Sequence, residues 1–134
     1  MINKNYKYSE VTSLIIGLAM EVHRELGNGF QEVIYQRALE IEFSKNLIPF
    51  DREFVMPVLY KGEEIGTRRV DFLLYKKISL ELKALINLEK VHFAQAINYL
   101  EAYNLEIGLL INFGAQSLEV KRLLNKKMSE PRFN

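Results

Sequence analysis

Three charged side chains stand inside an otherwise apolar stretch of the sequence, RVDFLLYKKISLELKA at residues 69–84. They are Asp71, Glu81 and Lys83, and the stretch has the composition of two β-strands joined at a pair of lysines. Because side chains alternate between the faces of a strand, Glu81 and Lys83 point to one face, away from the leucines between them. The turn folds Asp71 back opposite Glu81 or Lys83, depending on the pairing register. In either register two carboxylates and one ammonium group meet on one patch.

These groups are suited to the hydrolysis of a phosphodiester bond. Carboxylate oxygens at close range favour a hard divalent cation such as Mg²⁺, which also binds water and substrate phosphate. Such a metal polarises a phosphoryl oxygen and activates a water molecule as the nucleophile. A neighbouring lysine orients that water or stabilises the charge that develops in the transition state. The patch therefore predicts metal-dependent phosphodiester hydrolysis.

A structural interpretation of the same patch is an ordinary cross-strand salt bridge. The spacing of Glu81 and Lys83 recurs at Glu119 and Lys121, which we interpret as solvated surface. The spacing alone therefore does not distinguish the two interpretations. The wider arrangement favours catalysis, because an aspartate lies one strand earlier and the next helix carries a glutamine and a tyrosine one turn apart.

Hydrophobic periodicity predicts the elements that position this patch. Two helices come first, then a three-stranded meander, a third helix, an interior strand and a final strand that the alternation favours over a helix. The expected helices are 9–27, 30–45 and 87–103, and the expected strands are 50–60, 67–75, 78–83, 107–113 and 117–124. Together they predict a single α/β domain over residues 1–134, with a mixed central β-sheet flanked by helices in the order ααβββαβ(β).

Individual residues refine these expectations. Pro57 predicts that the first strand lies at an edge of the sheet or carries a bulge, because proline cannot donate to a ladder. Asn87 is the expected N-cap of the third helix. Ala94, Ile97 and Leu100 are expected to face inward from that helix.

Composition limits the class of protein. The chain has 134 residues, of which 49% are hydrophobic and 26% charged, as expected for a soluble globular domain with a sizeable core. The net charge of +1 leaves no global basic field for nucleic acid, so any such surface must be local. Cysteine is absent and no stretch is long enough to span a membrane, so we expect a cytoplasmic protein without membrane association.

Four segments, in the same order along the chain, resemble a known nuclease superfamily. Asp71, nine intervening residues and then Glu81-Leu82-Lys83 resemble the metal and catalytic motif of the PD-(D/E)XK superfamily, although no proline precedes the aspartate. GFQEVIY at residues 29–35 resembles the motif that names its GxxExxY family. HFAQAINYL and GLLINFG resemble the glutamine-and-tyrosine helix and the strand that follow in these nucleases. The resemblance covers nearly the whole chain and implies a restriction-endonuclease-like core.

The resemblance implies a role for each residue of the central motif. Asp71 and Glu81 would bind the metal, with the backbone carbonyl of Leu82 as a further ligand. Lys83 would position the attacking water or stabilise the transition state. The cofactor implied is Mg²⁺, or Mn²⁺ in its place.

The outer motifs imply four further residues. Glu32 would complete the acidic cluster or hold a second metal, and Gln95 would orient the site or contact the substrate backbone. Tyr99 and Tyr35 would support the site. From the residues alone, Glu32 fits a solvated helix face equally well, and both tyrosines fit packed aromatics.

We therefore predict a Mg²⁺-dependent nuclease that acts on nucleic acid, with DNA as the favoured substrate and a homodimer as one expected assembly. The alternative is a catalytically inactive module of the same fold that binds nucleic acid or a protein. A third class is a toxin- or defence-associated interaction protein in which the acidic cluster is a relic. A local basic rim from the lysines and arginines near the meander is compatible with all three.

Overall fold

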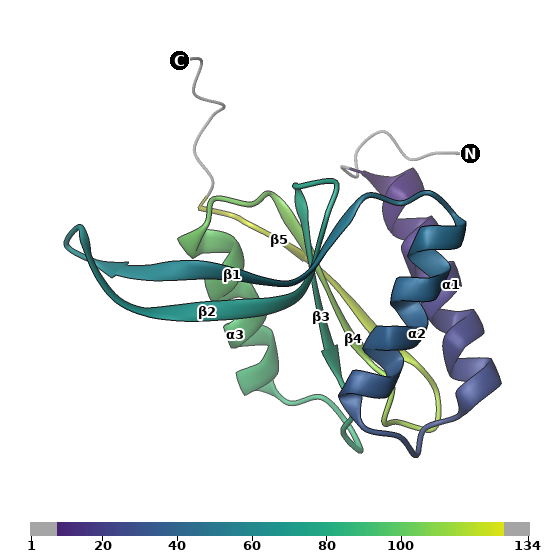
Figure 1. Ribbon diagram of the computed structural model, residues 1–134. Coiled ribbons are helices and arrows are strands. Elements are labelled where there is room, and N and C mark those ends of the chain that lie inside the picture. Colours follow the sequence, from purple (N-terminus) through teal and green to yellow (C-terminus); the bar gives the residue numbers. More distant parts are fainter. Residues whose placement is uncertain (1–7, 128–134) are drawn as a thin grey trace.

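The computed structural model describes residues 8–127, which form a five-stranded sheet between two layers of helices (Figure 1). Helices α1 (Ser9–Leu26) and α2 (Glu32–Lys45) lie on one side of the sheet, and α3 (Lys90–Ala102) lies on the other. The strands are β1 (Phe50–Tyr60), β2 (Glu63–Leu74), β3 (Ile78–Lys83), β4 (Ile107–Asn112) and β5 (Glu119–Leu124). The predicted α/β class and element order are confirmed, including the final strand.

The sheet is mixed and its strands lie in the order β1-β2-β3-β4-β5. The pairs β1–β2, β2–β3 and β4–β5 are antiparallel, whereas β3 and β4 are parallel because α3 connects them as a crossover. Both predictions from Pro57 are confirmed, since β1 is an edge strand and its register shifts between Val58 and Leu59.

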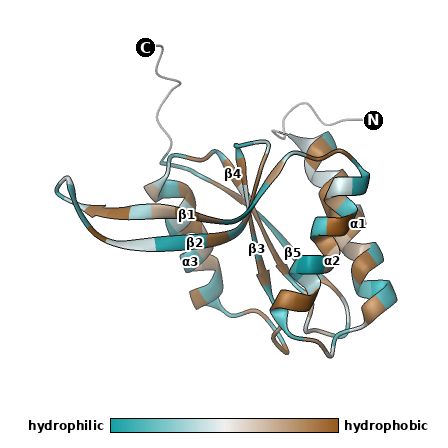
Figure 2. Cartoon of the chain, viewed as in Figure 1, coloured by the Kyte–Doolittle hydropathy of each residue, from teal (hydrophilic) through white to brown (hydrophobic). Residues whose placement is uncertain are grey.

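The main core lies between the sheet and the pair α1 and α2. Strands β3 and β4 are buried along almost their whole length, and Figure 2 shows the arrow of β3 in the hydrophobic colour. Fully buried side chains of the second helix are Tyr35, Leu39 and Phe43, while Ile41 is 56% exposed. The inward face of this helix is therefore rotated from the apolar positions that the sequence pattern singled out, because the larger side chains pack against the sheet.

Helix α3 differs from the prediction at its start and on its inner face. Its N-cap is Glu89 and not Asn87, because the Glu89 side chain accepts from the backbone of His92 and the His92 side chain accepts from the Glu89 backbone. This reciprocal cap begins the helix at Lys90. Leu100 is buried as predicted and Ile97 is partly buried, whereas Ala94 is exposed and Ala96 faces inward in its place.

Strands β1 and β2 extend beyond the rest of the sheet as a hairpin arm, residues 52–70 (Figure 1). A two-residue turn at Lys61 and Gly62, with φ angles of 50° and 84°, closes the arm and pairs Tyr60 directly with Glu63. Strand β2 therefore begins at Glu63, four residues earlier than expected. The point at which this arm leaves β3 is the setting of the charged patch.

Within residues 8–127, no helix combines the length and the apolar character that a bilayer span requires.

Candidate active site

Asp71 and Glu81 lie at the fork where β2 separates from β3. The ladder between these strands pairs Leu74, Leu73 and Phe72 with Ile78, Ser79 and Leu80, and the same register places Asp71 level with Glu81. One carboxylate oxygen of Asp71 then accepts the backbone N–H of Leu82 at 2.7 Å. At the point where the ladder ends, a side-chain carboxylate thus accepts the hydrogen bond of a strand N–H in place of a backbone carbonyl.

Asp71 is held from both of its oxygens. Oδ2 accepts from Leu82, and Oδ1 accepts the side-chain amide of Gln36 from α2 at 2.8 Å. Burial nevertheless raises the pKa of the Asp71 carboxyl above its ordinary value, against these hydrogen bonds and the positive charges of Lys83 and Arg69. The folded protein therefore favours neutralisation of this group, by a proton or by another positive charge.

Glu81 is only 7% exposed and pairs with an arginine from the preceding strand. Arg68 Nη2 lies 2.9 Å from Glu81 Oε1, and the Arg68 guanidinium carbon lies 5.4 Å from the centre of the Tyr99 ring. Burial raises the pKa of Glu81, Arg68 and Lys83 oppose the shift, and the charge of Asp71 adds to it. The ion pair that the sequence allowed is therefore present, but its cation is Arg68 and not Lys83.

Lys83 ends β3 close to all three acidic groups. Its charge favours the ionised form of Glu32, Asp71 and Glu81, yet no direct ion pair of its side chain is found within residues 8–127. Lys83 as a whole is partly exposed. It is therefore placed to meet a charged group that enters the site from solvent.

The chain that follows Lys83 is fixed by the end of β4. The Lys83 carbonyl accepts from the Phe113 backbone at 2.8 Å, and the fully buried Asn112 bonds both the N–H and the carbonyl of Leu85. Gly114 packs so closely that an added Cβ would lie 2.3 Å from the Leu85 nitrogen. The segment that resembles the family strand thus secures the end of β3 and the position of Lys83.

Glu32 reaches the site from the first residue of α2. Its side chain is open to solvent, yet partial burial raises its pKa, followed by the repulsion of Asp71 and, less strongly, of Glu81. Like charges are therefore close enough to act on one another at this edge of the sheet. The solvated-face interpretation holds for exposure alone, because the group still lies within the electrostatic reach of the other two carboxylates.

Gln36 was missed in the sequence, although it makes the direct contact between α2 and Asp71. It is 4% exposed, and its Oε1 atom is buried without a hydrogen-bond partner among the described residues. The one available signal was its position four residues after Glu32, which places both on one face of the helix. A glutamine among charged and apolar helix residues carries no signature of burial by itself.

Tyr99 approaches the fork from α3. Tyr99 is buried beneath Arg68, its hydroxyl lacks a partner within residues 8–127, and burial raises its pKa to about 12. Gln95 lies one turn earlier and is exposed to solvent. The structure thus leaves the predicted contact of Gln95 with a substrate as a prediction.

Tyr35 belongs to a different place in the fold. Its hydroxyl donates to the Gly27 carbonyl at 2.6 Å and accepts from the Phe30 backbone at 3.1 Å. Its ring stacks on Phe113, with 4.6 Å between the ring centres. Tyr35 therefore fixes the loop that leads into α2, and supports Glu32 through that loop.

The oxygen donors at the fork suit a hard divalent cation in their chemistry but are not arranged as a complete cage. Among the described residues, no group of three or more His, Cys, Asp or Glu side chains is gathered to hold a metal. Asp71 and Glu81 supply carboxylates that burial disfavours as free anions, and the unpartnered Gln36 oxygen lies beside them. These residues fit a cation such as Mg²⁺ that completes its shell with water and substrate.

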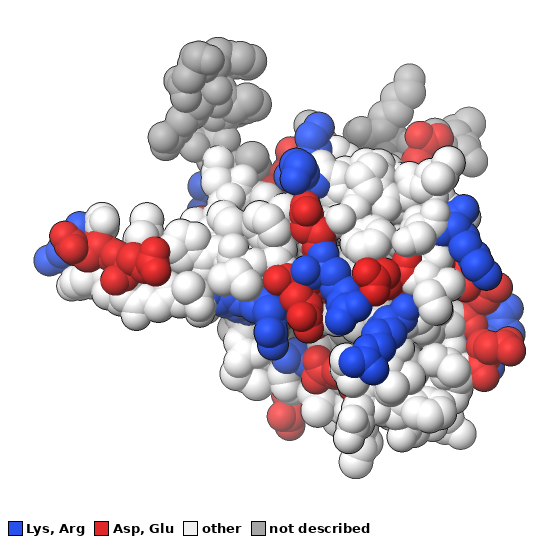
Figure 3. Space-filling model, in the orientation of Figure 1, with Lys and Arg blue, Asp and Glu red and all other residues white. Residues whose placement is uncertain are grey.

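Charges around the site alternate in sign. Figure 3 shows blue and red side chains interleaved over the middle of this face, near the base of the arm, whereas much of the arm is uncharged. Opposite charges also pair directly, with Arg52 Nη1 2.6 Å from Glu40 Oε1 and Lys76 Nζ 3.3 Å from Asp51 Oδ2. The predicted basic rim is thus partly neutralised by neighbouring carboxylates.

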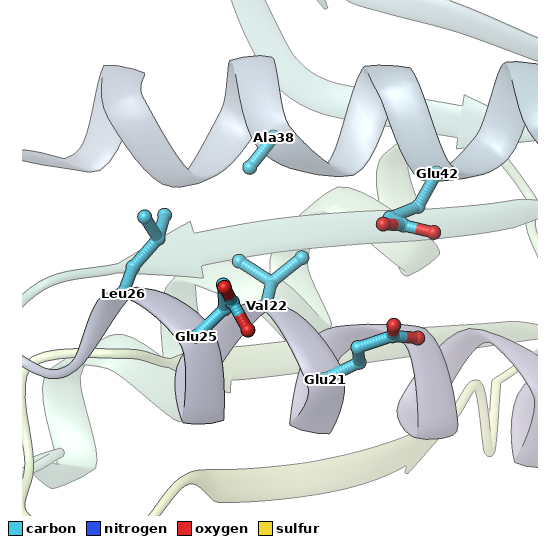
Figure 4. Close-up of a pocket in the computed structure, with 6 residues that line it drawn as sticks. All are labelled: Glu21, Val22, Glu25, Leu26, Ala38 and Glu42. Carbon is cyan, nitrogen blue, oxygen red and sulfur yellow. The ribbon is translucent and has the colours of Figure 1, made fainter.

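A groove between α1 and α2 is distinct from the fork. Figure 4 shows Glu21 and Glu25 from the first helix and Glu42 from the second around an apolar floor of Val22, Leu26 and Ala38. All of its charged lining residues are acidic, so it repels phosphate. It therefore does not extend the candidate site toward nucleic acid.

A family model and a solved structure are each similar to most of this chain. A family model described as the PD-(D/E)XK nuclease superfamily matches residues 9–123. The crystal structure of SSO0001 is similar, with a TM-score of 0.56 and 19% identity over 69% of this chain and 50% of that one. At this identity the similarity shows a common fold, and the chain spans half the length of that protein. A search of curated proteins found no match.

Proposed function

Since the chain belongs to the PD-(D/E)XK nuclease superfamily, we propose that it hydrolyses phosphodiester bonds of nucleic acid with the help of Mg²⁺ or Mn²⁺. The observation that carries the proposal is the fork, where Asp71 and Glu81 lie level on diverging strands with Lys83 beside them. We also assign the chain to the GxxExxY branch, on Gly29, Glu32 and Tyr35. DNA is the substrate that we favour.

In the proposed mechanism, Asp71 and Glu81 would hold the cation, with the Leu82 carbonyl as the further predicted ligand. A divalent cation bound there polarises a phosphoryl oxygen and lowers the pKa of water. Lys83 faces the same space and stabilises the negative charge that develops on the phosphate. Within residues 8–127 it has no direct ion pair, which supports this role because none of these contacts has to break.

Glu32 and Arg68 take the roles that their positions allow. Glu32 is exposed and has a raised pKa, which suits a group that accepts a proton from the attacking water. Arg68 neutralises Glu81 in the protein without cation. With Glu81 holding a cation, Arg68 would be able to contact a substrate phosphate instead.

The contact between Arg68 and Glu81 also favours a second candidate function, a binding module that does not cut. Glu81 is already neutralised by an arginine at 2.9 Å, as expected if no cation is ever bound. In that case Arg68, Arg69 and Lys83 would contact phosphates as a positively charged site alone.

A cleavage assay separates the two functions. Purified protein is incubated with single-stranded, duplex and branched DNA and with RNA, in Mg²⁺, Mn²⁺ or EDTA. Cutting that requires a cation and disappears in Glu81→Gln supports the nuclease. Binding to the same substrates in EDTA, without cutting in either cation, supports the binding module.

The assembly is a separate proposal. Val55, Leu59, Tyr60 and Ile65 expose more than half of their surface on the hairpin arm, and exposed apolar surface of this kind marks contacts between proteins. We keep the homodimer as a prediction, to be tested by sedimentation equilibrium. A strictly monomeric protein at high concentration would contradict it.

The lack of cysteine agrees with a reducing compartment, and we keep the cytoplasm as the expected location.

A further inference from the structure

We propose that Gln36 is a positioning residue of the hydrolytic site, which orients the Asp71 carboxylate with its amide nitrogen and binds a site water with its amide oxygen. The inference rests on the proposed function and deepens it. It assigns to α2 a second contribution besides Glu32, through a residue that none of the sequence motifs includes.

The orientation of the amide follows from the chemistry of Asp71. A carboxylate accepts hydrogen bonds and donates none, so the Gln36 nitrogen must be the atom that lies 2.8 Å from Asp71 Oδ1. The amide oxygen then points to the other side. The two ends of an amide are about 2 Å apart, so Oε1 remains close to the Asp71 carboxylate.

The amide oxygen is the unusual part of this contact. Gln36 is 4% exposed, and its amide oxygen is buried without a hydrogen-bond donor among the described residues. Buried polar atoms nearly always have a partner, and the exceptions call for a missing water or ion. A water molecule bound beside Asp71 needs oxygen acceptors for both of its hydrogens, and the Gln36 oxygen can be one of them. A bare cation has no hydrogen to donate and needs no such acceptor.

Asp71 needs a fixed orientation because its two oxygens have different neighbours. Oδ2 is bound to the Leu82 N–H, and Oδ1 is bound to Gln36. Without Gln36 the carboxylate keeps one contact and can rotate about it. Groups that orient a metal ligand in this way typically change metal affinity or activity 10–100-fold when they are removed.

The test compares Gln36→Met with wild type. Methionine has nearly the same length and volume, so it fills the space while removing the donor and the acceptor together. Mn²⁺ alone is titrated into each protein by calorimetry, and steady-state cleavage is measured in saturating Mn²⁺. We expect Mn²⁺ affinity to fall about tenfold or more, kcat to fall at saturating cation, and KM for nucleic acid to change little.

Leu39→Met is the matched control, because Leu39 is fully buried on the same helix and has no polar contact. Its Mn²⁺ affinity should equal that of wild type. Melting in EDTA is recorded for all three proteins. A role in packing alone would lower the melting temperature of Gln36→Met and leave its Mn²⁺ affinity unchanged, and this result would overturn the inference.

The outcomes also separate this inference from the function on which it rests. If wild type binds Mn²⁺ and cuts but Gln36→Met behaves identically, the inference about Gln36 fails and the nuclease stands. If wild type neither binds Mn²⁺ nor cuts, both fail together. Loss of affinity in Gln36→Met but not in Leu39→Met supports both.

Discussion

Lys83 and Arg68 are the two basic residues that meet the acidic fork, and they differ in what they contact. Arg68 is engaged with Glu81 and lies over the Tyr99 ring, whereas Lys83 acts on the three carboxylates through its charge without a direct ion pair in the described part of the chain. An engaged arginine stabilises the resting protein. A partly exposed lysine without a direct ion pair among the described residues can respond to an incoming phosphate.

This difference leads to a prediction for Lys83→Ala. Removal of a charge that acts on the transition state should lower kcat by about two orders of magnitude or more, while KM and nucleic-acid affinity change little. Lys45→Ala removes an exposed lysine from the end of α2 and should cut at the wild-type rate. Single-turnover cleavage of the three proteins gives the comparison, and a near wild-type rate for Lys83→Ala would remove Lys83 from the mechanism.

For Arg68→Ala we expect cation binding to become tighter. Arg68 competes with a cation for Glu81 and adds positive charge beside it, so its removal should tighten Mn²⁺ binding about tenfold in the absence of substrate. Arg52→Ala breaks a comparable ion pair with Glu40 and should leave the affinity unchanged. Calorimetric titration measures both variants, and weaker binding by Arg68→Ala would show that Arg68 supports the site and does not compete for it.

Among the elements, β3 is the one on which the site depends, and the end of β4 keeps it in place. Asn112 uses both ends of its amide, accepting from Leu85 and Gly114 and donating to Leu85 and Glu119. Gly114 approaches the backbone of residues 84 and 85 so closely that any Cβ requires a shift. The position of Lys83 thus depends on a residue thirty-one positions later.

Gly114→Ala should therefore destabilise the fold. The obstructing atoms belong to the backbone and cannot move aside as a flexible side chain can, so we expect a loss of about 1–3 kcal/mol or more. Gly17→Ala is the control of opposite sign, because Gly17 is exposed inside α1 with nothing within 4 Å of its added Cβ. It should stabilise by roughly 0.5–1 kcal/mol. Urea unfolding of both variants tests the pair, and equal stabilities would contradict the close approach.

Two of the strands were predictable from sequence more accurately than the helix faces. Strands β1 and β3 begin and end where the alternation and the turns place them. The start of α3 was wrong because a Glu89–His92 cap replaces the commoner asparagine cap. The buried face of α2 depends on which side chains reach the sheet, and such long-range packing is not visible in local periodicity.

The same distinction applies to the site. Asp71, Glu81 and Lys83 come together as their spacing predicted, because a hairpin brings nearby residues into register. Gln36 and Arg68 were not assigned these contacts, since neither residue is paired with its partner in a strand ladder. The local sequence around a polar residue does not predict which distant carboxylate that residue will contact.

At the scale of the whole molecule, the ionised carboxylates at the fork destabilise the folded protein in the absence of a cation. Burial raises the pKa of Glu32, Asp71 and Glu81 above the ordinary values of 4.5, 3.8 and 4.5. The folded protein therefore binds protons more tightly than the unfolded chain. The stability that these groups contribute is present in full below their ordinary values and is lost as pH rises through the raised ones.

Asp71→Asn removes one of these groups, so in EDTA its stability relative to wild type should increase as pH rises from 3.8 toward neutrality. The new amide can be accommodated because Gln36 can turn its unpartnered oxygen toward it, while the remaining oxygen still accepts from Leu82. Thermal unfolding across this pH range measures the difference. If Asp71→Asn is clearly less stable at neutral pH, the carboxylate serves the fold as part of a buried charge pair.

The most direct test of a cation held by Asp71 and Glu81 is a melting series in Mn²⁺ and in EDTA. A cation that binds only the folded protein stabilises it by RT ln(1 + [L]/Kd), about 2.7 kcal/mol at a hundredfold excess over Kd. Wild type should therefore melt higher in Mn²⁺, while Asp71→Asn and Glu81→Gln should show a much smaller rise. Glu42→Gln, in the acidic groove between α1 and α2, should respond as wild type does. A wild type that is indifferent to Mn²⁺, or a rise that survives in Asp71→Asn and is lost in Glu42→Gln, would contradict a cation site at the fork.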